Sequence, residues 1–112
     1  MTVMVRSGEL RHRVRLERRV EELDDAGGRS EDWREIGTRW ARIRPLSSRQ
    51  LMAAREAGLE ITHEVEVRYP APVTGVDRIV YRGRHLYPDG PPIDVDERRV
   101  KVMYRCQERV DP

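Results

Sequence analysis

The stretch WARIRPLSSRQLMAAREAGLEITHEVEVRY, residues 40–69, changes its hydrophobic period twice and thereby decides the fold. Residues 40–44 alternate apolar and charged side chains, as a strand does, and Pro45 ends that strand because it lacks an amide for the ladder. From Ile61 to Tyr69 the period is two again. The stretch predicts a β framework interrupted by one short helix.

The helix is expected over about 47–57, inside an inserted segment of 46–60. Ser47 can cap its first turn while the Gln50 side chain reaches back to the Ser47 amide. The interior consists of good helix formers, and Gly58 suits the left-handed residue that commonly ends a helix.

The rest of the chain supplies strands and turns on both sides of this insertion. We expect a first strand, a long and bulged second strand, a hairpin that reverses at Arg82-Gly83, and a closing strand, over residues 12–20, 33–44, 77–87 and 98–107. Five to six short antiparallel strands avoid open edges by closing into a small barrel or packing as a two-layer sandwich. The expected core residues are Val14, Leu16, Trp40, Ile43, Val65, Val67, Val100 and Val102.

The length of 112 residues predicts a single domain, 1–112, with residues 1–7 as a flexible N-terminal arm. Hydrophobic and charged residues each make up 38% of the chain, so the apolar faces must be narrow and the charged faces wide. The net charge is only +2 and the signs are interleaved, which gives no long-range attraction to phosphate.

Cysteine and hydropathy patterns point to a cytoplasmic protein without a membrane segment. The one cysteine, Cys106, excludes an internal disulfide and lies in an alternating row where a small buried side chain is expected. No apolar run approaches the ~20 residues of a membrane span. The first six residues are too short for the apolar part of a signal peptide.

The sequence shows no motif of a catalytic, metal-binding or cofactor-binding site. The three histidines fall on three different expected strands without ligand spacing, and His63 is interpreted as a core residue. Gly27-Gly28 lacks the Lys-Ser/Thr of a phosphate loop. Ser47-Ser48 is not surrounded by a nucleophile elbow. No cofactor is therefore expected, and the sequence does not predict an enzyme.

Nucleic-acid binding by a small β barrel is the main alternative function. Its best support is the pair Tyr81 and Tyr87 beside Arg82 and Arg84, since stacking platforms combine exposed aromatics with cations. Ordinary cross-strand packing explains the same hairpin pattern. A hydrolase is a weaker alternative, which would require a pocket with converging ionisable groups.

The order of several segments resembles the head-tail joining proteins of tailed bacteriophages, also called head-closure or stopper proteins, and their relatives in gene transfer agents. The resemblance covers nearly the whole chain and is carried by residues 8–14 (GELRHRV), Trp33, residues 40–47 (WARIRPLS), Thr62-His63 and residues 67–69 (VRY). It implies a structural protein that forms a ring between the portal-adaptor complex and the tail, joins head to tail and helps to retain packaged DNA.

The resemblance also implies partners and a location. The partners would be further copies of the chain in a ring, a portal or adaptor protein, a tail terminator or tail tube protein, and DNA that passes through the channel without sequence-specific binding. The location would be the neck of a virion or phage-like particle, after assembly in the cytoplasm of the bacterial host.

Two groups of residues are expected at the contacts of such a ring. In the related proteins the insertion after the Pro-Leu-Ser strand is associated with the channel, which makes the polar side of the insertion the lumen-facing candidate: Arg49, Gln50, Arg55, Glu56 and Glu60. A helix that only seals one mouth of the barrel remains an equal interpretation. The candidates for a subunit or adaptor interface lie beside the N-terminal arm: Glu9, Arg11, Arg13 and Arg15.

Overall fold

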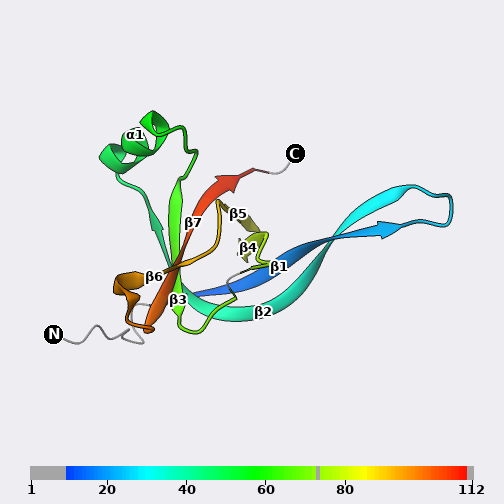
Figure 1. Cartoon of the computed structure of the whole chain (residues 1–112), viewed down its shortest axis with the longest axis horizontal. Helices are drawn as coiled ribbons and strands as arrows, with labels where there is room; N and C mark the ends of the chain where they lie inside the picture. The colour runs from blue at the N-terminus through cyan, green and yellow to red at the C-terminus, as the bar shows by residue number, and fades with distance from the viewer. Residues whose placement is uncertain (1–9, 73, 111–112) are drawn as a thin grey trace.

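The computed structural model describes residues 10–72 and 74–110, which form seven strands and one α-helix (Figure 1). The elements in chain order are β1 (His12–Leu23), β2 (Arg29–Pro45), α1 (Ser48–Glu56), β3 (His63–Arg68), β4 (Arg78–Tyr81), β5 (Arg84–Pro88), β6 (Ile93–Asp94), a single 3-10 turn (Val95–Glu97) and β7 (Lys101–Arg109). The prediction of a mainly β fold with one short helix is confirmed. The two-residue strand β6 is additional to the five or six strands expected.

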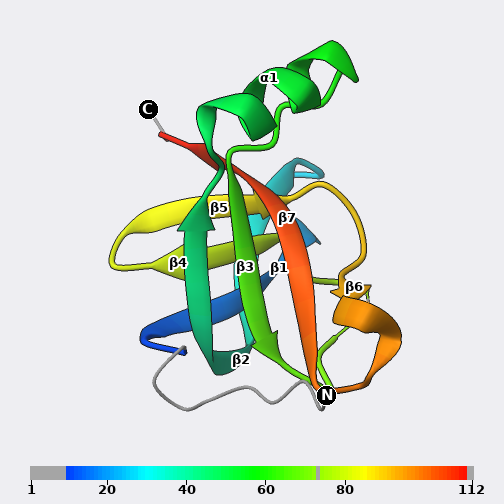
Figure 2. The same cartoon turned by 90° about the vertical axis from the view of Figure 1, so that its left-hand side faces the viewer.

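Antiparallel pairing links six of the strands into a ring-like sheet (Figure 2). The hydrogen-bonded order is β3-β2-β1-β4-β5-β7, and β7 pairs in turn with β3, so the circuit returns to its first strand. Strand β6 pairs with β7 beside this circuit. Because the circuit returns to β3, most strands have a partner on both sides.

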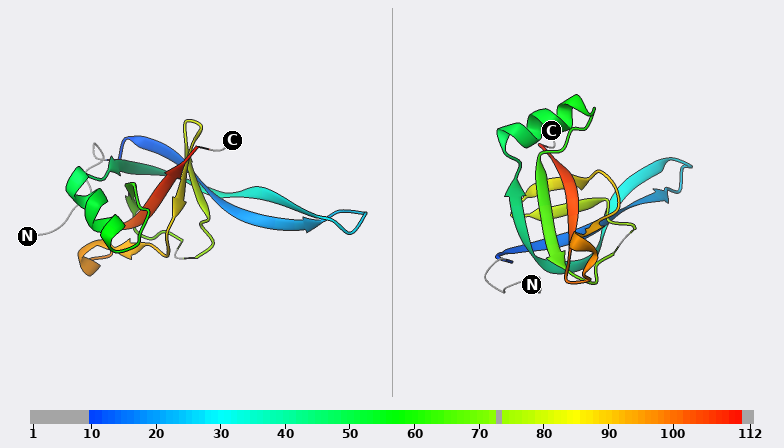
Figure 3. Two further views of the ribbon diagram at one scale, coloured as in Figure 1. Left: turned by 90° about the horizontal axis from the view of Figure 1, so that it is seen from above. Right: turned by 60° about the vertical axis from the view of Figure 1, so that its left-hand side comes forward.

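The β1–β2 hairpin is far longer than the sheet that supports it. Strand β4 pairs with β1 only at residues 15–17, and β3 pairs with β2 only at residues 41–45, whereas the β1–β2 ladder continues to Leu23 opposite Arg29. The distal part therefore projects as a two-stranded ribbon (Figures 1 and 3). The molecule measures 59 × 31 × 24 Å along its principal axes. The sequence did not predict this length, because residues 23–30 were expected to be one loop.

A bulge lies near the base of the hairpin. Leu16 pairs with Gly37 and the next residue of β1 pairs with Glu35, which leaves Ile36 as an extra residue in β2. The bulge expected within residues 33–44 is thus confirmed, and it increases the local twist where the ribbon leaves the body.

The core fills the inside of the ring-like sheet. Val14, Leu16, Val65, Val67 and Val102 are buried, together with residues of β4, β5 and β7, and Ile43 packs against this cluster. Tyr104 is also buried and donates its hydroxyl to the carbonyl oxygen of Pro72 at 2.6 Å. Burial raises the pKa of Tyr104 to about 12.

Two expected core residues are not in the core. Trp40 has 54% of its surface exposed, because Ala41 points inward and adjacent strand residues point to opposite faces. Val100 is only partly buried, because β7 begins at Lys101 rather than at residue 98. The backbone carbonyl of Val100 instead accepts a hydrogen bond from the Tyr69 amide.

Candidate interaction surfaces

Helix α1 stands at one end of the ring-like sheet (Figure 2). Hydrogen bonds at its first and last turns stabilise it. The Ser47 hydroxyl accepts the Gln50 amide and the Gln50 side chain accepts the Ser47 amide, so the predicted capping box is present. Gly58 has φ +77° and follows the last turn, where the Leu59 amide donates to the Ala54 carbonyl. Within the helix only Ala54 is buried, so α1 presents most of its surface outward.

All five lumen-facing candidates are exposed, but they differ in what they contact. Gln50 is used in the capping box, and Glu60 accepts a hydrogen bond from the Gln107 side chain at 3.0 Å. The other three, Arg49, Arg55 and Glu56, make no side-chain hydrogen bond or ion pair with the described residues. These three are therefore the members of the set best placed to contact something outside the chain.

A groove of about 370 Å³ lies between α1 and strands β3 and β7. Its lining is largely apolar and includes Ala54, Leu59, Ile61 and Met103. The ionisable groups along it are Glu64 and Arg105, and Glu64 is already paired with Arg44. The converging ionisable groups that a hydrolase would need are not gathered in this groove.

The N-terminal strip was expected to combine four charged residues with the N-terminal arm. Residues 1–7 and Glu9 lie outside the described residues. The structure places Arg11, Arg13 and Arg15 on the exposed side of the chain at the start of β1. Arg15 pairs with the carboxylate of Glu17 at 2.7 Å.

Arg13 forms a surface cluster that the sequence did not predict. It lies opposite Trp40 in the β1–β2 ladder, with its guanidinium carbon 5.4 Å from the centre of the Trp40 ring. It also donates to the Thr38 hydroxyl at 2.6 Å. Tryptophan and arginine are both enriched among the residues that contribute most to binding at the centre of protein interfaces.

The root of the projecting hairpin is fixed by a buried ion pair. Glu17 is 5% exposed and accepts hydrogen bonds from Arg15 and from Arg78 of β4, each at 2.7 Å. Burial alone would raise the pKa of Glu17, but the bonds from the two arginines outweigh it and hold that pKa below its usual value. The Arg78 guanidinium also lies 3.9 Å from the Trp33 ring centre, so β1, β2 and β4 are joined at this point.

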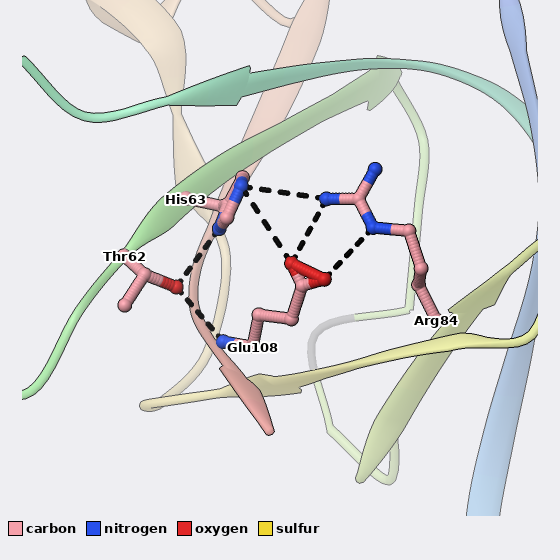
Figure 4. A network of polar contacts seen from close by, with 4 residues as sticks. All are labelled: Thr62, His63, Arg84 and Glu108. Carbon is pink, nitrogen blue, oxygen red and sulfur yellow. Dashed lines mark hydrogen bonds and ion pairs between the residues drawn. The ribbon is translucent and has the colours of Figure 1, made fainter. Parts of the chain in front are cut away.

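A second polar network joins β3, β5 and β7 (Figure 4). Arg84 donates to both oxygens of Glu108, at 2.8 and 2.9 Å. The Thr62 hydroxyl lies 2.8 Å from His63 Nδ1 and accepts the Glu108 amide at 2.8 Å. His63 is thus only partly buried, its ring faces the side chains of Thr62, Arg84 and Glu108, and it is not the core residue that its position on an apolar strand face indicated.

The electrostatics of this network favour a neutral imidazole. Burial lowers the pKa of His63, while the nearby Glu108 carboxylate opposes that shift from 3.9 Å. The hydrogen bond from Arg84 lowers the pKa of Glu108. Because Arg84 already neutralises Glu108, the arrangement ties three strands together and does not leave a base poised for proton transfer.

Comparison with known proteins places the chain in a family. A family model described as phage head completion protein matches residues 5–109. The chain belongs to the phage head completion protein family. A search of curated proteins gives no match.

A solved structure has the same fold. The solution structure of protein SF1141 from Shigella flexneri 2a superposes with a TM-score of 0.72 at 26% sequence identity. The match covers 96% of this chain and 100% of that chain.

Family membership gives this head completion protein a role in the phage particle. It is a viral structural protein of the virion, and head completion implies contacts with other head or tail proteins. The resemblance found in the sequence is thereby confirmed. The nucleic-acid alternative gains no support, because Arg82 lies over Tyr81 and Arg84 is bound to Glu108.

Two further observations apply to the described part of this family member. No group of three or more His, Cys, Asp or Glu residues in that part is arranged to hold a metal ion. Its helix is too short and too polar to cross a membrane. Burial raises the pKa of the Cys106 thiol, so this buried cysteine is a packing residue rather than a nucleophile.

Proposed function

We propose that this protein forms a ring at the neck of a phage or phage-like particle, between the portal-adaptor complex and the tail. The ring contacts the portal or adaptor protein on one side and a tail terminator or tail tube protein on the other, and it helps to retain the packaged DNA. The supporting observation is the head completion family match over residues 5–109. Assembly takes place in the host cytoplasm, and DNA crosses the ring without sequence-specific binding.

The surface chemistry supports a protein that works by making contacts with proteins. The chain carries 22 basic and 20 acidic residues for a net charge of only +2. Closing a ring requires a heterologous contact, in which one patch of a copy docks on a different patch of the next copy. A surface with charges of both signs can provide two such complementary patches.

We assign the channel-lining role to the outward side of α1, with Arg49, Arg55 and Glu56 as its principal contacts. The test replaces residues 49–57 by a short glycine-serine linker and measures DNA retention in filled heads. Loss of DNA from heads that still bind the protein is the expected result. Unchanged retention would reject the gating role and leave α1 as a helix that only covers one end of the sheet.

Measuring affinity for DNA at several salt concentrations tests the alternative function, nucleic-acid binding. Real phosphate contacts release counterions, so affinity for DNA would fall steeply between low and physiological salt. We expect no salt-dependent DNA binding by the purified chain. A steep salt dependence would favour a nucleic-acid-binding function over a passive channel.

The N-terminal arm has its own test. A variant without residues 1–7 should fold, because β1 begins only at His12, and it should fail to attach to heads. Circular dichroism checks folding and co-sedimentation with filled heads checks attachment. Normal attachment of the shortened chain would show that the arm is not the docking element.

A further inference from the structure

An exposed surface on β1, β2 and β3 has the composition of an interface centre. We define the Trp40 face as Arg13, Trp40 and Arg68. Arg13 lies directly opposite Trp40, and Arg68 follows Val67, the partner of Ala41, so it borders Trp40 from the β3 side. Trp40 is 54% exposed, and neither arginine forms an ion pair with a described carboxylate. Tryptophan and arginine are the residues most enriched at binding hot spots.

The projecting hairpin carries the opposite charge. We define the hairpin arm as residues 20–32, which contain six carboxylates and one arginine, a net charge of −5. Since the whole chain has a net charge of +2, the other residues together carry +7. Glu22 and Asp25 form no ion pair within the described residues, and Leu23 between them is 76% exposed.

The hairpin arm and the Trp40 face lie at different ends of the β1–β2 hairpin: Arg13 pairs with Trp40 near the start of β1, and the hairpin arm begins seven residues further along β1, where Val20 pairs with Asp32. Figure 2 views the body from the side opposite the hairpin arm, and β3, β7 and the C-terminal part of β2 lie in front. The Glu17–Arg78 pair and the stacking of Arg78 on Trp33 fix the direction of the arm at its root. The arm of one chain therefore cannot reach its own Trp40 face, but it can reach that of a neighbouring copy.

We infer that the hairpin arm of one copy docks on the Trp40 face of the next copy, which is the heterologous contact that closes the ring. Glu22 and Asp25 pair with Arg13 and Arg68, and Leu23 packs against Trp40. The inference rests on the proposed ring, and it names the partner surface within it. The occupant is a second copy because the hairpin arm carries carboxylates where the Trp40 face carries arginines, and each surface has one exposed apolar side chain, Leu23 or Trp40, to pack against the other.

Charge reversal on the two surfaces tests this contact. The arm variant is Glu22→Arg/Asp25→Arg and the face variant is Arg13→Glu/Arg68→Glu. Each alone should reduce tail joining to filled heads by about tenfold or more, because like charges then meet at every contact. Joining should be restored by a variant with all four substitutions, because its basic arm then meets an acidic face on the next copy. Joining should also be restored by a mixture of the arm and face variants, because the arm of each variant has the opposite charge to the face of the other.

Two results would overturn the inference. Normal joining by the arm variant or the face variant overturns it. Failure of both the fourfold variant and the mixture overturns it as well, and indicates that each surface binds a different protein such as the adaptor. Asp89→Arg/Glu97→Arg and Arg82→Glu/Arg99→Glu are matched controls at other exposed positions, and they should join tails normally.

Cross-linking provides a second readout that does not depend on tail joining. Leu23→Cys and Thr38→Cys are placed in separate chains, mixed on filled heads and treated with a short bis-maleimide, while the native Cys106 is buried. We expect linked dimers that contain one chain of each kind. Absence of such dimers on occupied heads overturns the inference. If heads lacking the protein altogether join tails normally, the proposed function fails instead.

Discussion

Leu16 and Trp40 show how little the size of a side chain says about its contribution to stability. Leu16 is fully buried in the core, whereas Trp40 is 54% exposed. We expect Leu16→Ala to lower the free energy of unfolding by about 2–5 kcal/mol through lost burial and a residual cavity. Trp40→Ala should cost about 1 kcal/mol or less, since it removes an exposed ring and one cation–π contact.

Urea unfolding of the two purified variants measures this difference. Circular dichroism at matched urea concentrations gives both midpoints and both slopes. A loss for Trp40→Ala as large as that for Leu16→Ala would contradict an outward-facing Trp40. The Trp40 variant should also fail in tail joining, which separates its role in assembly from its small role in folding.

His63 should make stability depend on pH near neutrality. Burial lowers its pKa from 6.5, so the folded chain holds this proton more weakly than the unfolded chain does. Its favourable contribution is complete above about pH 6.5 and is lost as the pH falls through the lowered value. Glu108, whose pKa lies below 4.5 because of the bond from Arg84, adds a second loss at lower pH.

The measurement compares wild type with His63→Gln at about pH 7.5 and about pH 5.5. Wild type should lose more unfolding free energy between the two values than the variant, because glutamine does not titrate. Equal losses in the two proteins would assign the pH dependence to other groups. Arg84→Gln provides a control, because it changes the network without removing the imidazole.

The sequence predicted side-chain burial well where the period of two was unbroken and poorly where it was not. Val65, Val67, Val102 and Cys106 are buried as the alternation indicates. Trp40 and Ile43 are three residues apart, so they cannot share one face of a regular strand. Only the position of the bulge, at Ile36, decides which of them points inward, and that position depends on pairing with β1.

At the scale of elements, α1 is set by local sequence rather than by packing. Its capping box and its glycine stop were both visible in the sequence, and only Ala54 is buried. We expect Ser47→Ala to weaken the helix by about 1 kcal/mol, because the Gln50 amide loses its acceptor. Hydrogen exchange should then speed up at the amides of α1 and remain unchanged in β3 and β7.

The matched control for this helix is Ser48→Ala, which lies one residue inside the helix and leaves the cap intact. It should leave exchange in α1 close to wild type. Faster exchange throughout the sheet of the Ser47 variant would mean that the helix is coupled to the core. That outcome would contradict a helix that is set by local sequence rather than by packing.

The hairpin is the element whose extent sequence alone could not predict. Residues 20–32 are polar and glycine-containing, which is as typical of a loop as of an exposed ribbon, and none of them is buried. Their strand structure comes from the ladder that Leu16 and Val14 begin in the core and that continues outward. The Glu17–Arg78 pair joins residues 61 positions apart, so sequence spacing did not reveal it.

At the scale of the whole molecule, the hairpin arm determines the elongated shape but contributes little to the stability of the fold. The Cα radius of gyration is 15.5 Å, whereas a compact domain of this length has about 13 Å. We expect a variant with Asn-Gly in place of residues 20–32 to fold, because Arg19 and Trp33 are already paired and a two-residue turn can join them. Its free energy of unfolding should change by about 1 kcal/mol or less, since the removed residues are largely exposed.

Small-angle scattering and unfolding together check this trimmed variant. We expect a smaller radius of gyration and an unchanged unfolding midpoint. A large fall in the unfolding midpoint would show that the hairpin arm is needed for the stability of the fold. The trimmed chain should nevertheless fail to complete heads, because the acidic surface that meets the next copy is gone. A compact, stable chain that still joined tails would mean that the 59 Å length of this molecule serves some contact other than the one between its copies.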